Sequence, residues 1–334
     1  MARRRFTGWV LTAAWLAAAS PVHGYLKMGT QVGTDTVALA WKTTPVRYMI
    51  SDGGVPGVSV DQFRDAVGRA FATWQAVPTS SIAFQFAGVS GAQPLDEDGV
   101  SVLGFLSRPD LDRVLASTSF LIDTRTGEIL ESDVFFNSAF AWSVDPSGES
   151  GRFDLESIAL HEIGHVHGLG HSALGETELS GGGGRRLIAA GAVMFPIAYI
   201  AGTTIGRTLM ADDIAGTSDL YPDAAFRQST GSIQGRVRKG GAGVYGAHVV
   251  ALDLRSGALV GNFSLDDDGR FVIAGLSPGA YVVRAEPLDD GDVESFLDDP
   301  GPVDLDFKVA IHPQLVVVPA GGAPPSIDVE VQPK

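Results

Sequence analysis

The chain has 334 residues, of which 45 % are hydrophobic and 19 % are charged. This composition excludes a disordered chain, and the length accommodates about two packed domains. The formal net charge of −15 repels phosphate backbones, which argues against nucleic acid as a partner. The absence of cysteine excludes disulfides, thiol nucleophiles and thiolate metal ligands.

The N-terminus has the pattern of an export signal. Arg3, Arg4 and Arg5 precede an apolar stretch from Val10 to Ala19. We therefore predict a signal peptide over residues 1–24, because this stretch is shorter than the ~20 residues of a membrane span. An uncleaved anchor is the alternative. Since no later stretch is long and apolar enough, we expect no stable membrane anchor. An exported chain without cysteine favours a bacterial, secreted protein, with the periplasm as the other location.

Residues 25–225 mix predicted strands and helices. A helix begins after Ser59, where Gln62 three residues later completes a capping-box pattern. Its apolar residues recur at helical spacing, so one face should pack on a sheet. The predicted strands are 46–50, 82–87, 101–105, 115–123 and 129–137. A turn at Thr126-Gly127 predicts that the last two strands form an antiparallel hairpin.

A second helix is predicted to begin after Asp154, a good N-cap, and to end at Gly168. A third is predicted from about Ala211 to Leu220. Residues 222–230 are polar and irregular, and we place the domain boundary there. Residues 231–334 contain short apolar segments separated by Gly, Asp and Pro, which favours a small all-β sandwich. Its predicted strands are 232–237, 247–252, 271–273, 280–285 and 314–318.

The residues with the clearest chemistry lie in the second helix and just beyond it. His161 and His165 are four residues apart, so they share one helical face and can bind one metal ion. Gly168 can adopt positive φ, and the turn it permits brings His171 round as a third ligand. Three protein ligands leave a position open for water, as in catalytic zinc sites.

Glu162 adjoins the first ligand and can reach a water molecule held on the ion. Zinc lowers the pKa of its bound water toward ~7 and polarises a carbonyl group. Glu162 is then predicted to act as general base and to return the proton to the leaving amine. His167 lies on another face of the helix, which predicts a surface or supporting role for it.

This eleven-residue pattern resembles the metzincins, and within them the matrixins. Ser172 after the third histidine, Ala192-Val-Met194-Phe-Pro196, and the segment from Leu209 to Pro222 carry the resemblance further. It implies an α/β (α+β) catalytic domain with a mixed twisted sheet and an active-site helix. It also implies a zinc metalloendopeptidase with protein or peptide substrates.

Further roles follow from the resemblance alone. Met194 is implied as the hydrophobic floor of the zinc site in a Met-turn, and Pro196, Ile197 and Ala198 as a wall of the substrate pocket. Asp212 and Asp213 are implied to anchor the closing helix against the Met-turn, with N-terminal helix capping as the alternative.

The chain also departs from the matrixin pattern. It has no cysteine to block the zinc, so latency by a cysteine switch is not expected. The interval from His171 to Met194 is longer than usual, and we interpret it as a mobile insertion near the substrate pocket. Only His248 and His312 lie outside the signal and the motif, which predicts one zinc ion. Calcium near Asp96, Asp98 or Asp133 stays open beside a second explanation, solvated loops.

Residues 231–334 resemble the carboxypeptidase regulatory-like, transthyretin-like sandwich. The resemblance rests on Gly235-Arg-Val, Gly246-Ala-His-Val249, Asp268-Gly-Arg-Phe271 and Gly275-Leu-Ser-Pro-Gly-Ala-Tyr281. Asp266 to Asp268 fits a hairpin turn better than a calcium loop. The resemblance predicts the fold and not the function of this region.

The sequence therefore predicts a secreted, zinc-dependent metalloendopeptidase followed by a β-sandwich. Two alternatives remain: an exported adhesin or matrix-binding protein on an idle protease scaffold, and a protease that cuts only itself or one partner. The intact Glu162 argues against the idle scaffold, because zinc binding alone does not need it. The sequence does not determine the oligomeric state.

Overall fold

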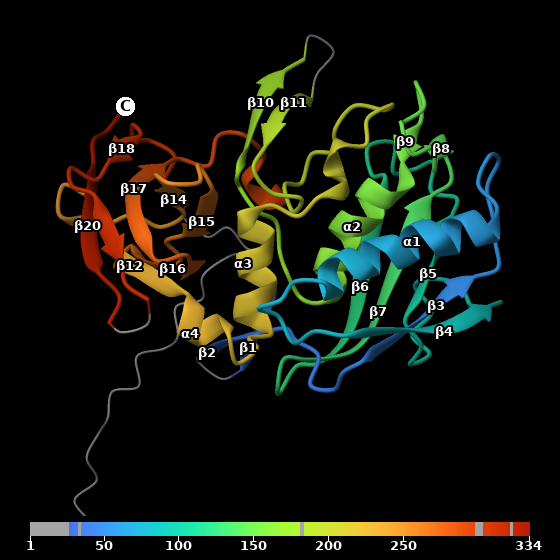
Figure 1. The fold of residues 1–334 in the computed structure, drawn as a ribbon. Helices are drawn as coiled ribbons and strands as arrows, with labels where there is room; N and C mark the ends of the chain where they lie inside the picture. The colour runs from blue at the N-terminus through green and yellow to red at the C-terminus, as the bar shows by residue number, and fades with distance from the viewer. Residues whose placement is uncertain (1–26, 33–34, 181–183, 298–302, 321–322) are drawn as a thin grey trace, which may run out of the picture.

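The computed structural model describes residues 27–32, 35–180, 184–297, 303–320 and 323–334. The predicted signal peptide, residues 1–24, lies outside them. Among the described residues, no helix is long and apolar enough to span a membrane. The chain forms an N-terminal unit with a sheet and helices and a C-terminal unit of strands, with α3 (Ala211–Leu220) between them (Figure 1).

The N-terminal unit is built on a mixed five-stranded sheet with the order β4-β3-β5-β7-β6. Its strands are β3 (Val46–Ser51), β4 (Phe84–Ser90), β5 (Val102–Leu106), β6 (Ala116–Asp123) and β7 (Glu128–Asn137). The β6–β7 pair is the predicted antiparallel hairpin, whereas the other pairs are parallel. Strand β6 therefore forms one edge of the sheet, and a chain can pair with it there.

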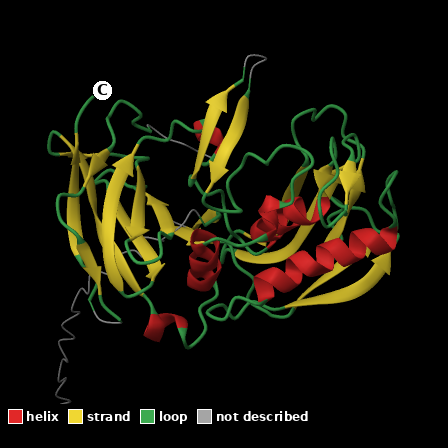
Figure 2. Cartoon of the chain, turned by 45° about the horizontal axis from the view of Figure 1, so that its top comes forward, coloured by secondary structure: helices red, strands yellow, loops and turns green. Residues whose placement is uncertain are grey.

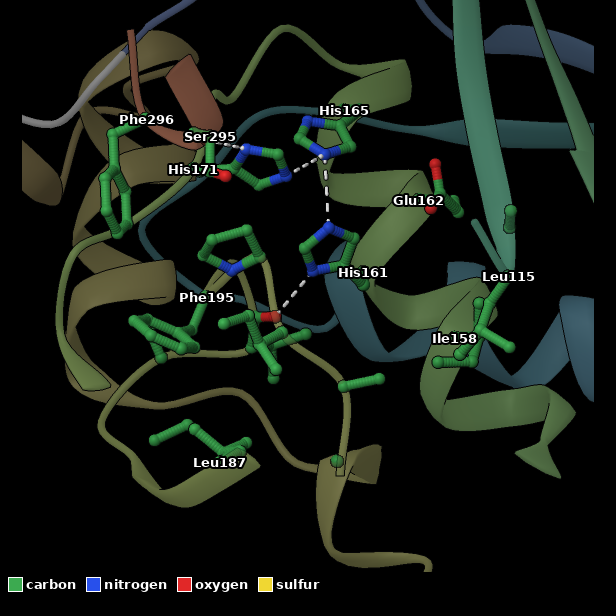
Figure 3. Close-up of a pocket in the computed structure, with 18 of the residues that line it drawn as sticks. Leu115, Ile158, His161, Glu162, His165, His171, Leu187, Phe195, Ser295 and Phe296 are labelled. Atoms are coloured by element: carbon green, nitrogen blue, oxygen red, sulfur yellow. Dashed lines mark hydrogen bonds between the residues drawn. The ribbon is translucent and has the colours of Figure 1, made fainter. Parts of the chain in front are cut away.

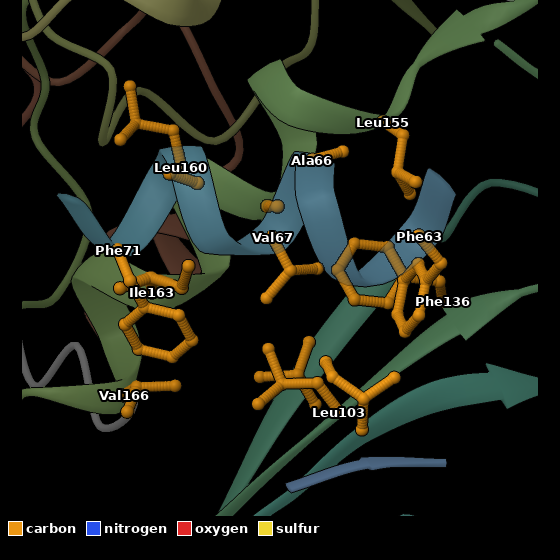
Figure 4. Close-up of a cluster of buried hydrophobic side chains, with 14 of the residues drawn as sticks. Phe63, Ala66, Val67, Phe71, Leu103, Phe136, Leu155, Leu160, Ile163 and Val166 are labelled. Carbon is orange, nitrogen blue, oxygen red and sulfur yellow. The ribbon is translucent and has the colours of Figure 1, made fainter. Parts of the chain in front are cut away.

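Helices α1 (Val60–Gln75) and α2 (Leu155–Val166) pack against each other and against this sheet (Figure 2). The capping box predicted at Ser59 is present, with Ser59 Oγ accepting from Gln62 N and Gln62 Oε1 accepting from Ser59 N. Phe63 and Val67 of α1 pack into one core with Leu160 and Ile163 of α2 (Figure 4). Trp74 Nε1 donates to Leu160 O at 2.8 Å, which joins the two helices inside this core.

Several elements were not predicted from the sequence. A hairpin of β1 (Gly29–Val32) and β2 (Asp35–Ala38) precedes β3, and short strands β8 (Trp142–Ser143) and β9 (Phe153–Asp154) pair before α2. The interval after His171, predicted as a mobile insertion, contains a hairpin of β10 (Gly175–Leu179) and β11 (Arg185–Ala190) that the sequence analysis did not predict. Two further short helices are η1 (Ile205–Arg207) and α4 (Phe226–Ser229), the latter within the segment predicted to be irregular.

The described residues of the C-terminal unit form two sheets around a second apolar core. One sheet contains β12 (Gly231–Lys239), β13 (Ala242–Gly243), β16 (Arg270–Leu276) and β20 (Ser326–Val331). The other contains β14 (His248–Asp253), β15 (Leu259–Phe263), β17 (Gly279–Glu286), β18 (Ala310–Ile311) and β19 (Val316–Val318). The core draws buried residues from both sheets, as the all-β prediction requires, while the transthyretin-like assignment stays a prediction.

The two units meet across a buried apolar interface. Ala215 of α3 belongs to the core of the C-terminal unit, and Asp212 Oδ1 accepts from Gly261 N of β15 at 2.8 Å. A further buried cluster combines Phe195, which follows the Met-turn methionine, with Phe263 and Phe296 of the C-terminal unit. The C-terminal unit therefore packs directly beside the segments that carry the predicted metal ligands.

We predict that Ser59→Ala lowers the free energy of unfolding by about 1 kcal/mol, because it removes the acceptor for Gln62 N at the start of α1. Urea unfolding measures the change. Ser107→Ala, at an exposed position outside any helix, is the control and should leave the midpoint unchanged. Equal midpoints for the two variants would contradict a stabilising capping box.

Candidate metal centre

Helix α2 and the turn after it position the three predicted ligands. The N-cap residue Asp154 accepts from Ser157 N at 2.9 Å through Oδ2, which fixes where the helix begins. The chain then turns at Gly168, which has φ +98°; a Cβ there would lie 2.3 Å from Leu39 O, so a larger residue does not fit. The turn brings His171 to the face of α2 that carries His161 and His165 (Figure 3).

The Nε2 atoms of the three histidines converge on one point. His165 Nε2 lies 3.2 Å from His161 Nε2 and 3.1 Å from His171 Nε2. A tetrahedral zinc ion with nitrogen ligands at 2.0–2.1 Å needs ligand atoms about 3.3 Å apart. The three side chains therefore fit a zinc ion, and they are the one cluster of at least three potential ligands found among the described residues.

Each imidazole is oriented by a backbone carbonyl at its other nitrogen. His161 Nδ1 lies 2.7 Å from Val193 O, and His165 Nδ1 lies 2.7 Å from Leu169 O. His171 Nδ1 lies 2.5 Å from Ser295 O, in the C-terminal unit. A carbonyl can only accept, so each Nδ1 carries the proton and each Nε2 keeps its lone pair for a metal.

Electrostatics favour the neutral, ligating form of these rings. Burial, followed by the nearby His171, lowers the pKa of His161 to about 3. Burial also lowers the pKa of His165 well below its ordinary value, and it lowers that of His171. A cluster of rings that resists protonation is suited to hold a cation in their place.

Glu162 is buried beside the histidines, with its side chain directed toward β6 (Figure 3). Its Oε2 accepts from Thr118 Oγ1 of β6 at 2.7 Å. Burial raises the pKa of Glu162 to about 7, although the Thr118 hydrogen bond lowers it. A carboxylate with a pKa in this range can accept and return a proton near neutral pH.

Met194 is buried against α2. Its side chain packs on Gly164, which lies between His161 and His165 in the sequence. Asp213 holds this turn, because its carboxylate accepts from Val193 N at 2.8 Å and from Met194 N at 3.1 Å. The same carboxylate accepts from Met210 N at 2.8 Å, so Asp213 both anchors the turn and caps α3. Asp212, in the first turn of α3, accepts from Gly261 N in β15 and also bonds to the Ser172 side chain.

A cleft of about 1260 Å³ runs past the histidines and Glu162. Pro196, Ile197 and Ala198, the residues predicted to form a wall of the substrate pocket, are among those that line it. Thr118 and the segment from Ser295 to Leu297 also line it, and no sequence pattern indicated either. A threonine on a strand and a serine that acts through its main chain carry no motif, so only the fold reveals them.

His167 is not at the surface, contrary to one of its predicted roles. Its ring is fully buried between Trp74, Phe84 and Tyr221, and neither nitrogen has a hydrogen-bond partner among the residues that the structure describes. Burial lowers its pKa to about 3, so it is a neutral core residue. The reason is that position 167 follows the last turn of α2 and faces α1 instead of the cleft.

Asp133 is not in a solvated loop. It is buried on β7, and its carboxylate accepts from Leu95 N at 2.6 Å and from Val102 N at 2.7 Å. Burial, which outweighs these bonds, raises its pKa to about 6. The carboxylate therefore organises the preceding loop, while calcium at Asp96, Asp98 or Asp133 stays a prediction.

At Asp266, the predicted hairpin turn is present, with Gly269 N donating to Asp266 O at 2.9 Å.

Comparison with known proteins agrees with this site. Residues 40–179 match the family model described as Matrixin. Metalloendoproteinase 1 of Glycine max is 30 % identical over 176 residues, which cover 48 % of this chain and 46 % of that protein. Metalloendoproteinase 4-MMP of Arabidopsis thaliana is 36 % identical over 87 residues, 25 % of this chain and 20 % of that protein. Metalloendoproteinase 5-MMP of the same plant is 41 % identical over 68 residues, 20 % of this chain and 14 % of that protein.

These likenesses support a matrixin-type metalloprotease domain in this chain. The matched region contains all three histidines and Glu162 but ends before Met194. The alignment with Metalloendoproteinase 1 spans less than half of that protein's length.

We predict opposite effects for two Gly→Ala substitutions in helices. At Gly164 a Cβ would lie 2.2 Å from Met194 Sδ and 3.0 Å from Trp74 Cζ2, so Gly164→Ala should cost about 1–3 kcal/mol through overpacking. At Gly68 of α1 nothing lies within 4 Å, so Gly68→Ala should stabilise by up to ~1 kcal/mol. Thermal unfolding compares them. A Gly164→Ala chain as stable as Gly68→Ala would refute tight packing under the metal centre.

Proposed function

We propose that this chain is a secreted, zinc-dependent metalloendopeptidase that hydrolyses internal peptide bonds of proteins. The observation that supports it most is the convergence of three Nε2 atoms beside a buried carboxylate in an open cleft. His161, His165 and His171 would hold one zinc ion. When bound there, the ion would supply an activated water and polarise the scissile carbonyl.

Glu162 is the proposed general base. Its Oε2 is held by Thr118, so we assign proton transfer to Oε1. Oε1 takes a proton from the attacking water and delivers it to the leaving amine. Burial of the carboxylate keeps bulk water from competing for this proton.

The substrate is proposed to bind as an extended strand along β6. This strand is the edge of the sheet, and Leu115 to Thr118 line the cleft. Main-chain hydrogen bonds to an edge strand orient a peptide without demanding one sequence. Pro196, Ile197 and Ala198 are proposed as the pocket wall for a substrate side chain, and Met194 as the floor beneath the zinc.

Export to the extracellular space or the periplasm is proposed from residues 1–24, and a bacterial source from the absence of cysteine in an exported chain. The basic start and the short apolar run support it. Mass spectrometry of the mature protein from the medium or the periplasm should find an N-terminus near Tyr25. An intact N-terminus in protein recovered from the membrane would contradict cleavage.

The function is tested by comparing the wild type with Glu162→Gln on a mixed protein substrate. We predict a ~10²- to 10⁴-fold loss of kcat/KM in the variant, because general base catalysis contributes that much, while one zinc ion stays bound. Removing zinc with a chelator should abolish activity, and adding zinc back should restore it.

Glu156→Gln is the matched control. It removes a carboxylate from the same helix, where Glu156 pairs with Arg69 outside the cleft, so activity should persist. Full activity in Glu162→Gln would contradict the proposed mechanism. A wild type that binds zinc but cuts nothing in the mixture would support the adhesin or single-partner alternatives instead.

A further inference from the structure

The third histidine is oriented by a residue 124 positions later in the chain. His171 Nδ1 lies 2.5 Å from Ser295 O, whereas the carbonyls that hold His161 and His165 belong to Val193 and Leu169 in the N-terminal unit. Ser295 ends the short helix η2 (Val293–Ser295) of the C-terminal unit. Figure 3 shows Ser295 and Phe296 beside the His171 ring.

Two buried side chains directly after η2 fix its position. Phe296 and Leu297 are only 3 % and 5 % exposed, in a cluster that includes Phe195 and Leu187 of the N-terminal unit. The rings of Phe195 and Phe296 lie with centroids 6.1 Å apart. Burial of Phe296 and Leu297 between the two units holds the preceding residue, Ser295, at the edge of the cleft.

A pair of hydrogen bonds ties the same segment to the hairpin after His171. Asp290 Oδ1 accepts from Thr177 N at 2.9 Å, and Asp290 O accepts from Thr177 Oγ1 at 2.8 Å. Thr177 lies on β10, six residues beyond His171. The C-terminal unit thus holds both His171 and the chain that follows it.

We propose that Phe296 positions the Ser295 carbonyl, which in turn fixes the orientation and tautomer of His171, so that the C-terminal unit completes the metal centre. The carbonyl accepts a hydrogen bond from Nδ1–H, which leaves the Nε2 lone pair facing the other two histidines. Partners of this kind control metal affinity, and their loss costs typically 10- to 100-fold. This inference rests on the proposed zinc site and assigns the C-terminal unit a role in it.

The test measures the zinc affinity of the full chain by competition with a chelator. Phe296→Ala removes the side chain that docks η2, and we expect zinc to bind ~10- to 100-fold more weakly. Phe296→Leu keeps an apolar side chain in the cluster and should restore most of the affinity. Phe86→Ala, at a 40 % exposed position on β4, is the matched control and should bind zinc like the wild type.

A double-mutant cycle separates positioning of His171 from general loosening of the fold. In a His171→Ala background, Phe296→Ala should cause no further loss of zinc affinity, because the ring that it positions is gone. In a His161→Ala background, the ~10- to 100-fold loss should persist. Equal losses in both backgrounds, or wild-type affinity in a folded Phe296→Ala chain, would overturn the proposal.

Circular dichroism and thermal unfolding check that each variant folds. If Phe296→Ala does not fold, Leu297→Ala, which removes the other buried side chain after Ser295, takes its place in the cycle; a loss that vanishes with His171→Ala supports the proposal and an unchanged affinity overturns it. A wild type without zinc would defeat the proposed function as well. Tight zinc binding in the wild type that Phe296 variants do not alter would overturn this inference alone.

Discussion

The candidate metal centre depends on three imidazole rings whose Nδ1 atoms are each held by a backbone carbonyl. The bonds to Val193, Leu169 and Ser295 come from separate parts of the chain, so the convergence of the three histidines requires the turn at Val193, the turn after α2 and the C-terminal unit to be in place together. Burial alone would favour neutral rings but would not aim them. The hydrogen bonds to the carbonyls orient the rings, and the fold places these carbonyls beside them.

Buried carboxylates organise the surroundings of this centre. Asp213 gathers three backbone N–H groups from the Met-turn and the start of α3, and Asp212 joins α3 to β15. Burial raises the pKa of Asp212 to about 7 and that of Asp213 to about 6, because removing a charged carboxylate from water costs free energy. The hydrogen bonds offset this cost and fix the segments that meet beside the three histidines.

Sequence patterns predicted the elements whose signals are local. Capping at Ser59 and Asp154, the turn at Gly127 and the i, i+4 histidines depend on neighbours within a few residues, and the structure contains all of them. The hairpin after His171 was missed because its glycines resemble a loop. His167 was misplaced because its environment comes from Trp74 and Tyr221, far away in sequence.

The contribution of the C-terminal unit to the site could not have been predicted from the sequence. Ser295 acts through its main chain, and Phe296 is an ordinary apolar residue in a region whose strands indicate only a fold. Contacts of this kind follow from how the two units pack. Two residues 124 positions apart produce no periodic pattern or short motif in the sequence that would indicate their contact. The same holds for Thr118, whose partner Glu162 lies on another element.

Zinc K-edge X-ray absorption of the purified full chain tests the central claim most directly. Three converging Nε2 atoms predict one zinc ion per chain with three nitrogen ligands at 2.0–2.1 Å and one oxygen ligand in the open position. Absence of zinc, or a first shell without three imidazole nitrogens, would contradict the account.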